Sequence, residues 1–261
     1  MFQQTYAHSG LRDDLLSVEL PQGKSNSAHK AVDLVEGFLV STVLGARRTS
    51  HVGMLRTDEV VREIFGWKRG VGDPSTYSRF FRKFSIEGND LLFTGLMRRW
   101  WSRMEVRKLT IDVDSTVITR YGHQEGAEVG YNPSKHGRAS HHPLMAFCEE
   151  LQMVVNGWMR PGNTNAATDA DHFLAQLLLI VPPERIGLLR GDIGFYGEPF
   201  MRALEADKVP YIIRGRMTSA LLSKVVSIRN WNHDSTVFPD AQYAEFAYKA
   251  AGWSKARRAI A

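Results

Sequence analysis

Two segments of the sequence each place an aspartate at the end of a predicted strand. The first is Leu109–Ser115, in which Asp112 and Asp114 alternate with apolar residues, and the second covers residues 186–192 and ends in Asp192. A strand turns successive side chains to opposite faces, so we expect Asp112 and Asp114 on one face and the apolar residues on the other. Two carboxylates from neighbouring strands could hold a divalent metal ion against a phosphate, which is the chemistry of polynucleotidyl transfer.

The residues before these segments have helical periodicity and are expected to form an N-terminal region over 1–105. Asp73 followed by Pro74 is typical of a helix start, because aspartate caps free N–H groups and proline is tolerated in the first turn. The aromatic residues that follow recur on one helix face, which indicates a core stripe rather than a platform for stacking bases. This stripe consists of Tyr77, Phe80, Phe81 and Phe84. Four helices are expected: 28–43 after a Ser27 cap, 57–66, the segment opened by Asp73, and one that carries Leu92, Leu96, Met97 and Trp100 and continues through Arg103.

From Lys108 onward the apolar pattern changes to the period of two that strands show. The expected order is a strand at 109–113, strands at 144–148 and 151–155, a helix from Thr168, a strand at 186–189, a helix at 198–206 and a strand at 209–213. Three antiparallel strands followed by a helix and two further strands beside the first make the core of a ribonuclease H-like fold. The expected fold class is therefore α/β, with a ribonuclease H-like domain over 106–261. The Gly- and His-rich stretch after the first strand is expected to be a loop.

The composition suits a globular protein with a polyanionic partner. The 261 residues include 33 Lys and Arg against 28 Asp and Glu, and an apolar share of 43% is enough for a proper core. Cys148 is the one cysteine and lies in an apolar run, so we expect no internal disulfide and a reducing cytoplasm. The first residues carry no basic segment followed by an apolar one, and no run approaches the roughly 20 apolar residues of a membrane span. We therefore expect a soluble, cytoplasmic protein without a membrane partner.

Several basic residues could contact DNA phosphates, which supply most of the sequence-independent affinity. A solvated surface is the more common role for a single basic pair. The segments 135–138 and 214–216 are the stronger candidates for DNA contact. The expected fold places 214–216 close to the strand that ends in Asp192. The candidates for DNA contact are Lys135, Arg138, Arg214, Arg216, Arg98 and Arg99.

The histidines do not have the spacing of a zinc site. His141 and His142 are adjacent rather than four residues apart, and a single cysteine makes a zinc knuckle improbable. Together with His123 and His136, they are expected to be loop or DNA-facing polar groups.

A set of short motifs resembles one family. The motifs are Asp112-Val113-Asp114-Ser115-Thr116, Tyr121-Gly122-His123-Gln124-Glu125-Gly126, Gly130-Tyr131-Asn132, His142-Pro143-Leu144 and Arg190-Gly191-Asp192-Ile193-Gly194-Phe195-Tyr196. In this order and spacing they resemble the DDE transposases of bacterial insertion sequences, in particular the branch with the group 1 transposase DDE domain. The resemblance spans about 109–261, with a weaker similarity in 75–80.

The resemblance implies an enzyme that binds element ends in double-stranded DNA, cuts the DNA with Mg²⁺ or Mn²⁺, and joins the 3′ hydroxyl to a target. It also implies self-association on the DNA, and the helical region over 1–105 is expected to serve DNA binding and assembly. Carried over by motif, Asp114 is the first acid and Asp192 the second, and both are metal ligands. Asp112 shares a strand face with Asp114, so it is either a carboxylate that supports the ligands from outside or the first acid itself.

The family also has a third acid, usually a glutamate on a helix that follows an inserted, strand-rich segment. Residues 231–261 resemble the start of that insertion, which we expect to begin at about 225, and the sequence ends before the expected helix. The acids available for this role do not occupy the matching place; they are Glu198, Asp234, Asp240 and Glu245. We therefore expect a C-terminally truncated transposase with an incomplete domain and impaired turnover. Two other functions stay open, which are a DNA-binding remnant or inhibitor without catalysis and a nuclease that hydrolyses without joining.

Overall fold

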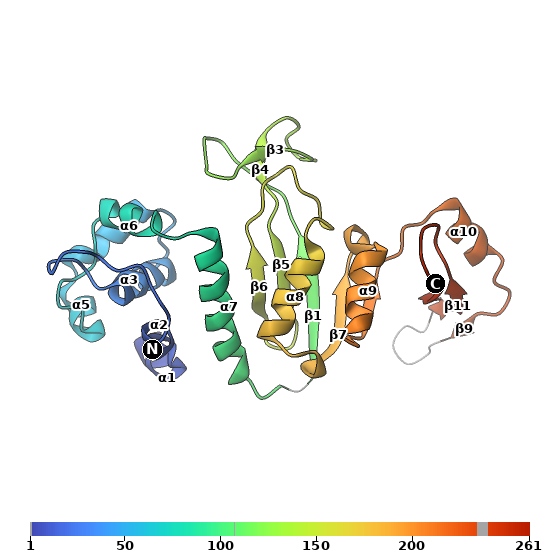
Figure 1. Cartoon of the computed structure of the whole chain (residues 1–261), viewed down its shortest axis with the longest axis horizontal. Helices are drawn as coiled ribbons and strands as arrows, with labels where there is room; N and C mark the ends of the chain where they lie inside the picture. Colours follow the sequence, from blue (N-terminus) through green and yellow to red (C-terminus); the bar gives the residue numbers. More distant parts are fainter. Residues whose placement is uncertain (1, 107, 234–239) are drawn as a thin grey trace. The chain divides into compact units, whose positions relative to one another are not determined.

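The chain forms two compact units in the computed structural model, which describes residues 2–106, 108–233 and 240–261 (Figure 1). The first unit ends at Met104 and the second begins at Glu105. Each unit has its own buried core, and each is described by itself below.

The first unit is helical, and its sixth helix begins where the sequence predicts a cap. Asp73 accepts a hydrogen bond from the Thr76 N–H at 2.7 Å, and Pro74 occupies the first turn. Tyr77 and Phe80 on this helix are buried, so the prediction of a core stripe is confirmed for these two residues. The elements are α1 (Phe2–Ser9), α2 (Leu11–Leu16), α3 (Ala31–Val43), α4 (Thr49–Val52), η1 (Gly53–Thr57), α5 (Glu59–Phe65), α6 (Pro74–Phe81) and α7 (Ile86–Ser102).

Two expected helix starts in this unit were wrong. Helix α3 begins after Lys30, and the Ser27 hydroxyl lies 2.8 Å from that of Ser25 instead of capping a helix. Helix α5 begins at Glu59, because Asp58 is the residue that caps it by accepting from the Val61 N–H at 2.9 Å. Helices α1, α2 and α4 were not predicted, because they are too short to show a helical period and, unlike the equally short α5 and α6, have no aspartate cap to mark their start.

A buried carboxylate organises the core of the first unit. The Glu36 side chain is 1% exposed and accepts hydrogen bonds from the Tyr6 hydroxyl at 2.6 Å and from the Trp67 indole N–H at 2.9 Å. It is also paired with the Arg12 guanidinium. These contacts compensate the desolvation of a charge that would otherwise be costly to bury, and they join α1, α2 and α3.

The second unit is built on a mixed five-stranded sheet with the order β6-β5-β1-β7-β8 (Figure 1). Strands β1, β5 and β6 are antiparallel, whereas β7 is parallel to β1 and β8 is parallel to β7. The predicted order of three antiparallel strands, a helix and two further strands is confirmed, and this is the arrangement of a ribonuclease H-like core. The elements are β1 (Leu109–Ser115), β5 (Leu144–Cys148), β6 (Met153–Trp158), α8 (Ala170–Ile180), η2 (Pro183–Arg185), β7 (Ile186–Gly191), η3 (Ile193–Phe195), α9 (Glu198–Ala206) and β8 (Tyr211–Ile213).

The core of this unit lies on one face of the sheet. The apolar residues of β1 and those opposite them on β5 are buried together with Phe173, Leu174 and Leu177 of α8. Helix α9, whose predicted bounds are confirmed, buries Phe200, Met201 and Leu204. The aspartates of β1 therefore belong to the opposite, more open face.

The stretch between β1 and β5 is not simply a loop, which corrects the sequence prediction. It forms a small sheet of three strands, β2 (Ile118–Thr119), β4 (Ala139–His141) and β3 (Glu128–Val129), in the order β2-β4-β3. Gly130 allows the connection between β6 and α8 to approach this small sheet, because a Cβ atom there would lie 2.0 Å from the Gly162 carbonyl oxygen. Strands of two or three residues show no readable alternation, so the sequence pattern could not reveal them.

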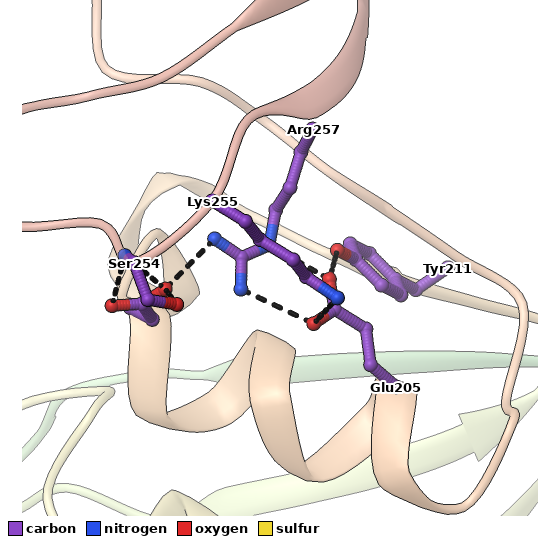
Figure 2. A network of polar contacts seen from close by, with 6 residues as sticks. Glu205, Tyr211, Ser254, Lys255 and Arg257 are labelled. Carbon is purple, nitrogen blue, oxygen red and sulfur yellow. Dashed lines mark hydrogen bonds and ion pairs between the residues drawn. The ribbon is translucent and has the colours of Figure 1, made fainter.

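The C-terminal part is rich in short strands and is attached to α9 by Arg257. This guanidinium is buried and binds Glu205 at 2.7 Å and Glu198 at 3.2 Å, while Ser254 donates to Glu198 and Lys255 lies 3.0 Å from Glu205 (Figure 2). The elements are α10 (Ser219–Val226), β9 (Asn232–His233), β10 (Gln242–Tyr243), β11 (Glu245–Tyr248) and β12 (Arg257–Ile260). Among the described residues, no helix is long and apolar enough to cross a membrane.

This attachment is expected to weaken in acid. Hydrogen bonding by Arg257 lowers the pKa of Glu205 to about 2 from an ordinary value of 4.5. Because the folded-state pKa is depressed, the stabilisation is complete above the unfolded pKa and is lost as the pH falls from 4.5 toward 2. Glu205→Gln should therefore destabilise the protein at pH 6 in urea unfolding and have a much smaller effect at pH 3. A matched change at the exposed Glu184, to Gln, should show no such contrast, and an equal loss from Glu205→Gln at both pH values would contradict the prediction.

Candidate metal and nucleic-acid site

Asp114 and Asp192 follow the last paired residues of two adjacent parallel strands. Val113 of β1 lies opposite Gly191 of β7, so each aspartate comes next on its own strand. Neighbouring strands are about 4.8 Å apart, and the carboxyl ends of parallel strands share one edge of a sheet. The structure thus brings the two carboxylates to the same edge.

Both carboxylates are exposed and only partly used by the protein. One oxygen of Asp114 accepts from the Ser115 N–H at 2.7 Å, and one oxygen of Asp192 accepts from the Gly194 N–H at 2.9 Å. The second bond makes Asp192 the cap of η3. Within the described part of the chain neither carboxylate forms an ion pair. Each therefore keeps an oxygen available to a hard cation such as Mg²⁺ or Mn²⁺.

Asp112 lies on the same strand face but in a different environment. The Arg190 guanidinium donates to both of its oxygens, from Nε at 2.6 Å and from Nη2 at 2.7 Å. Arg190 also lies 2.7 Å from Glu149, and its pKa is raised by these contacts, mainly by the hydrogen bond to Asp112. A bidentate pair of this kind leaves the Asp112 carboxylate engaged by the protein itself.

The structure does not bring a third acid to these two aspartates among the residues it describes. No group of three or more His, Cys, Asp or Glu side chains in the described ranges could hold a metal ion. Glu198 binds Ser254 and Arg257, and Glu245 is paired with Arg258. Asp240 is exposed beside β10, and Asp234 lies outside the described residues.

The basic residues predicted to contact DNA lie in three parts of the structure. Arg214 and Arg216 are exposed just after β8, and the Arg214 N–H donates to the Gly191 carbonyl at 3.0 Å, directly before Asp192. Lys135 and Arg138 are exposed between β3 and β4, where the Arg138 guanidinium lies 5.8 Å from the centre of the Tyr121 ring. Arg98 and Arg99 are exposed on α7 in the first unit.

The four histidines were expected to be loop or DNA-facing polar groups, and this is wrong for His141, which lies on β4; His142 is in the connection between β4 and β5 but is buried. His141 and His142 are 6% and 8% exposed, whereas His123 and His136 are exposed. His141 accepts from Arg120 at 2.7 Å, which makes it part of the small sheet's packing. The apolar residues that follow them, Pro143 and Leu144, are the sequence signal that could have indicated burial.

Sequence reasoning also missed Arg190 and His142 as neighbours of the aspartates. Arg190 stands two residues before Asp192 and is opposite Asp112 in the register, so knowledge of which strands pair would have revealed it. His142 lies 3.1 Å from the Ser115 hydroxyl, next to Asp114.

The second unit is thus α/β, with a ribonuclease H-like core that carries two open carboxylates at the ends of adjacent parallel strands. The family described as transposase DDE domain group 1 matches residues 1–261, so the chain belongs to this family. The match includes the helical first unit as well as the segment that carries the motifs.

Comparison with solved structures finds transposases. The piggyBac transposase synaptic complex with hairpin DNA is similar with a TM-score of 0.45 and 13% identity, over 95% of this chain and 55% of that chain. The Mos1 transposase paired-end complex with left transposon end is similar with a TM-score of 0.28 and 9% identity, over 80% of this chain and 73% of that chain. The Mos1 mariner paired end complex with Mn gives a TM-score of 0.28 and 10% identity, over 85% and 78%. The chain thus spans about half the length of the piggyBac chain, and no curated protein matches the sequence.

Proposed function

We propose that this protein cleaves double-stranded DNA at the ends of an insertion sequence and joins the 3′ hydroxyl to target DNA, using a divalent metal ion held by Asp114 and Asp192. The observation that carries the proposal is the parallel register that puts these two carboxylates at one sheet edge, each with an oxygen left open. Membership of the transposase DDE family supports the same reading.

The donors fit Mg²⁺ or Mn²⁺, since both are hard cations that prefer carboxylate oxygen. When bound, such an ion would activate the attacking water or 3′ hydroxyl and stabilise the leaving oxygen. The Ser115 and Gly194 N–H groups orient the two carboxylates. Asp112 acts from outside the metal site, because Arg190 holds both of its oxygens.

The basic residues around this edge would bind the substrate. Arg214 and Arg216 directly follow β8, and the Arg214 backbone lies next to Gly191, the residue before Asp192. Their charges therefore suit the DNA phosphates on either side of the phosphate that reacts. Lys135 and Arg138 would contact DNA from the small sheet, and Arg98 and Arg99 from the first unit. We propose that the protein also self-associates on DNA, so that two element ends are held together.

We further propose that this 261-residue chain turns over slowly. Two carboxylates hold a second metal ion weakly, and no third acid joins them among the described residues. The same observation favours a second candidate function, in which the chain occupies DNA without cutting it and acts as an inhibitor.

One assay separates these functions. The purified chain is incubated with Mg²⁺ or Mn²⁺, a supercoiled plasmid and end-labelled duplexes made from the DNA that flanks its coding sequence. Slow joining of label to the plasmid is the expected result. Hydrolysis without joining would indicate a nuclease, binding without either would indicate the inhibitor, and rapid turnover would contradict the impaired site.

The first unit offers a groove that suits a DNA backbone. It has a volume of about 570 Å³ and is lined by Lys24, His29, Arg79 and Lys83 along with serine and threonine residues, and no lining residue is acidic. Residues 1–104 hold 15 Lys and Arg against 11 Asp and Glu, so most of the net charge of +5 lies in this unit. These features support the proposal that the first unit contributes to DNA binding.

The double variant Lys24→Gln/Lys83→Gln should weaken DNA binding and flatten its salt dependence. If each lysine neutralises one phosphate, the slope of log K against log salt should fall in magnitude by about 1.8. A fluorescence anisotropy titration at several salt concentrations measures this slope. The double variant Arg56→Gln/Lys68→Gln removes the same charge from exposed positions outside the groove and should leave the slope nearly unchanged. Equal slopes for both double variants would contradict the proposal that the groove binds DNA.

A further inference from the structure

The connection between β6 and α8 is a compact loop that contacts His142 and Gly194, which lie near the two aspartates. Within residues 161–168, the Thr164 hydroxyl donates to the Pro161 carbonyl at 2.8 Å, and one Asn165 side-chain oxygen accepts from the Ala167 and Thr168 N–H groups at 2.9 and 3.1 Å. These internal bonds give the loop a defined shape.

The loop is connected to Asp114 through His142. The His142 Nδ1 atom lies 2.7 Å from the Thr164 carbonyl oxygen, which can only accept, so Nδ1 carries the proton. In the neutral ring Nε2 then accepts from the Ser115 hydroxyl at 3.1 Å. Ser115 is the residue whose N–H donates to Asp114.

The loop is connected to Asp192 through Gly194. A Cβ atom at Gly194 would lie 2.6 Å from the Cβ of Ala166 and 2.9 Å from the Asp192 carboxylate. Real side chains do not approach so closely, so Ala166 packs directly on the Gly194 backbone. The Gly194 N–H is the group that donates to Asp192.

Arg160 holds the two ends of the loop. Its side chain is 5% exposed, and burial lowers its pKa. Its Nε donates to the His142 carbonyl at 3.1 Å and its Nη1 to the Thr168 carbonyl at 2.6 Å, while the His142 N–H donates to the Arg160 carbonyl at 2.8 Å. The loop therefore cannot shift without disturbing His142, whose ring contacts the Ser115 hydroxyl beside Asp114.

We infer that residues 161–168 are a shared support that sets the spacing of the two metal-binding carboxylates, with His142 and Ala166 as positioning residues. The inference rests on the proposed metal binding by Asp114 and Asp192 and adds to it a set of residues that touch neither metal nor DNA. A support common to both carboxylates keeps their separation constant, which matters because a bridging cation tolerates little change in ligand distance.

A double-mutant cycle in Mn²⁺ affinity tests this support. Gly194→Ala should lower the affinity about tenfold, the lower end of what support of metal ligands contributes. Ala166→Gly should recover part of that loss in the double variant, because it removes the 2.6 Å contact while the 2.9 Å approach to Asp192 remains. Ser115→Ala, which removes only the hydroxyl bound by His142, should lower the affinity by a smaller factor. Electron paramagnetic resonance of free Mn²⁺ gives each affinity without any need for turnover.

Gly197→Ala is the matched control. This glycine lies in the same segment, and an added Cβ would meet nothing closer than Pro199 at 3.9 Å, so the affinity should stay within twofold of the wild type. If Gly194→Ala binds Mn²⁺ normally, or if Ala166→Gly fails to restore a loss, the shared support is wrong while the metal site stands. If the wild-type chain binds no Mn²⁺, the proposed function and the inference fall together.

Discussion

Replacing Asp114 by asparagine is expected to reduce metal-dependent strand cleavage by about 100-fold or more, while the melting temperature stays that of the wild type. Asparagine keeps the shape of the side chain and can still accept from the Ser115 N–H, but it lacks the charge that a cation needs. The exposed carboxylate contributes no ion pair within the described residues, so its loss should leave the fold intact. Single-turnover cleavage in Mn²⁺ and a thermal melt measure the two effects.

Asp112→Asn is the matched control, and its expected effects are reversed. This carboxylate is two residues away on the same strand face, yet it serves Arg190 rather than a cation. The pair is partly exposed, with side chains 35% and 42% accessible, so its loss should lower the melting temperature by only about 2–4 °C. Cleavage should fall less than tenfold. If Asp112→Asn abolishes cleavage and Asp114→Asn does not, the assignment of the first acid is wrong.

Arg257→Met is expected to detach the C-terminal strands from α9. The buried guanidinium neutralises Glu198 and Glu205 and lies 4.9 Å from the centre of the Trp253 ring, and methionine keeps the apolar stem without the charge. Removing one partner of a buried ion pair lowers the free energy of unfolding by more than the intact pair contributes to it. The reason is that the remaining carboxylates stay buried without a positive charge to offset their desolvation. We expect amide exchange in residues 244–261 to become about 30-fold faster or more.

Arg258→Met provides the comparison for this change. Arg258 is the next residue on β12, but its side chain is 69% exposed and pairs with Glu245 at the surface. Amide exchange in the same residues should change less than threefold, as for other exposed ion pairs. Similar exchange in the two variants, followed by hydrogen exchange and mass spectrometry, would show that Arg257 does not hold this segment.

The sequence predicted those parts of the fold whose signals are local. Alternation in Leu109–Ser115 placed the apolar residues of β1 in the core, and the Asp73-Pro74 start and the bounds of α9 were correct. Strands β5 and β6 were also predicted, although β6 begins at Met153 rather than at 151. Residues 149–152 therefore connect the two strands, with Gln152 in the left-handed region at a φ of 51°.

Other features depend on which segments become neighbours, and no local pattern reveals this. The Asp112 pair with Arg190 exists only because β1 and β7 are parallel partners in that register. His142 is covered by the loop after β6, where its ring contacts the carbonyl of Thr164, 22 residues further along the chain. The Glu205 and Arg257 pair joins α9 to β12 across 52 residues. These contacts explain why two candidate acids, Asp112 and Glu198, are engaged by arginines.

The most direct test of the central claim is a Mn²⁺ titration, followed by electron paramagnetic resonance, of the wild-type chain and of its Asp114→Asn, Asp192→Asn and Asp112→Asn variants. A site held by Asp114 and Asp192 predicts saturable binding to the wild type, a loss of affinity of at least about tenfold in the first two variants, and near-normal affinity in the third. Equal binding by the wild type and by Asp114→Asn and Asp192→Asn would contradict the account.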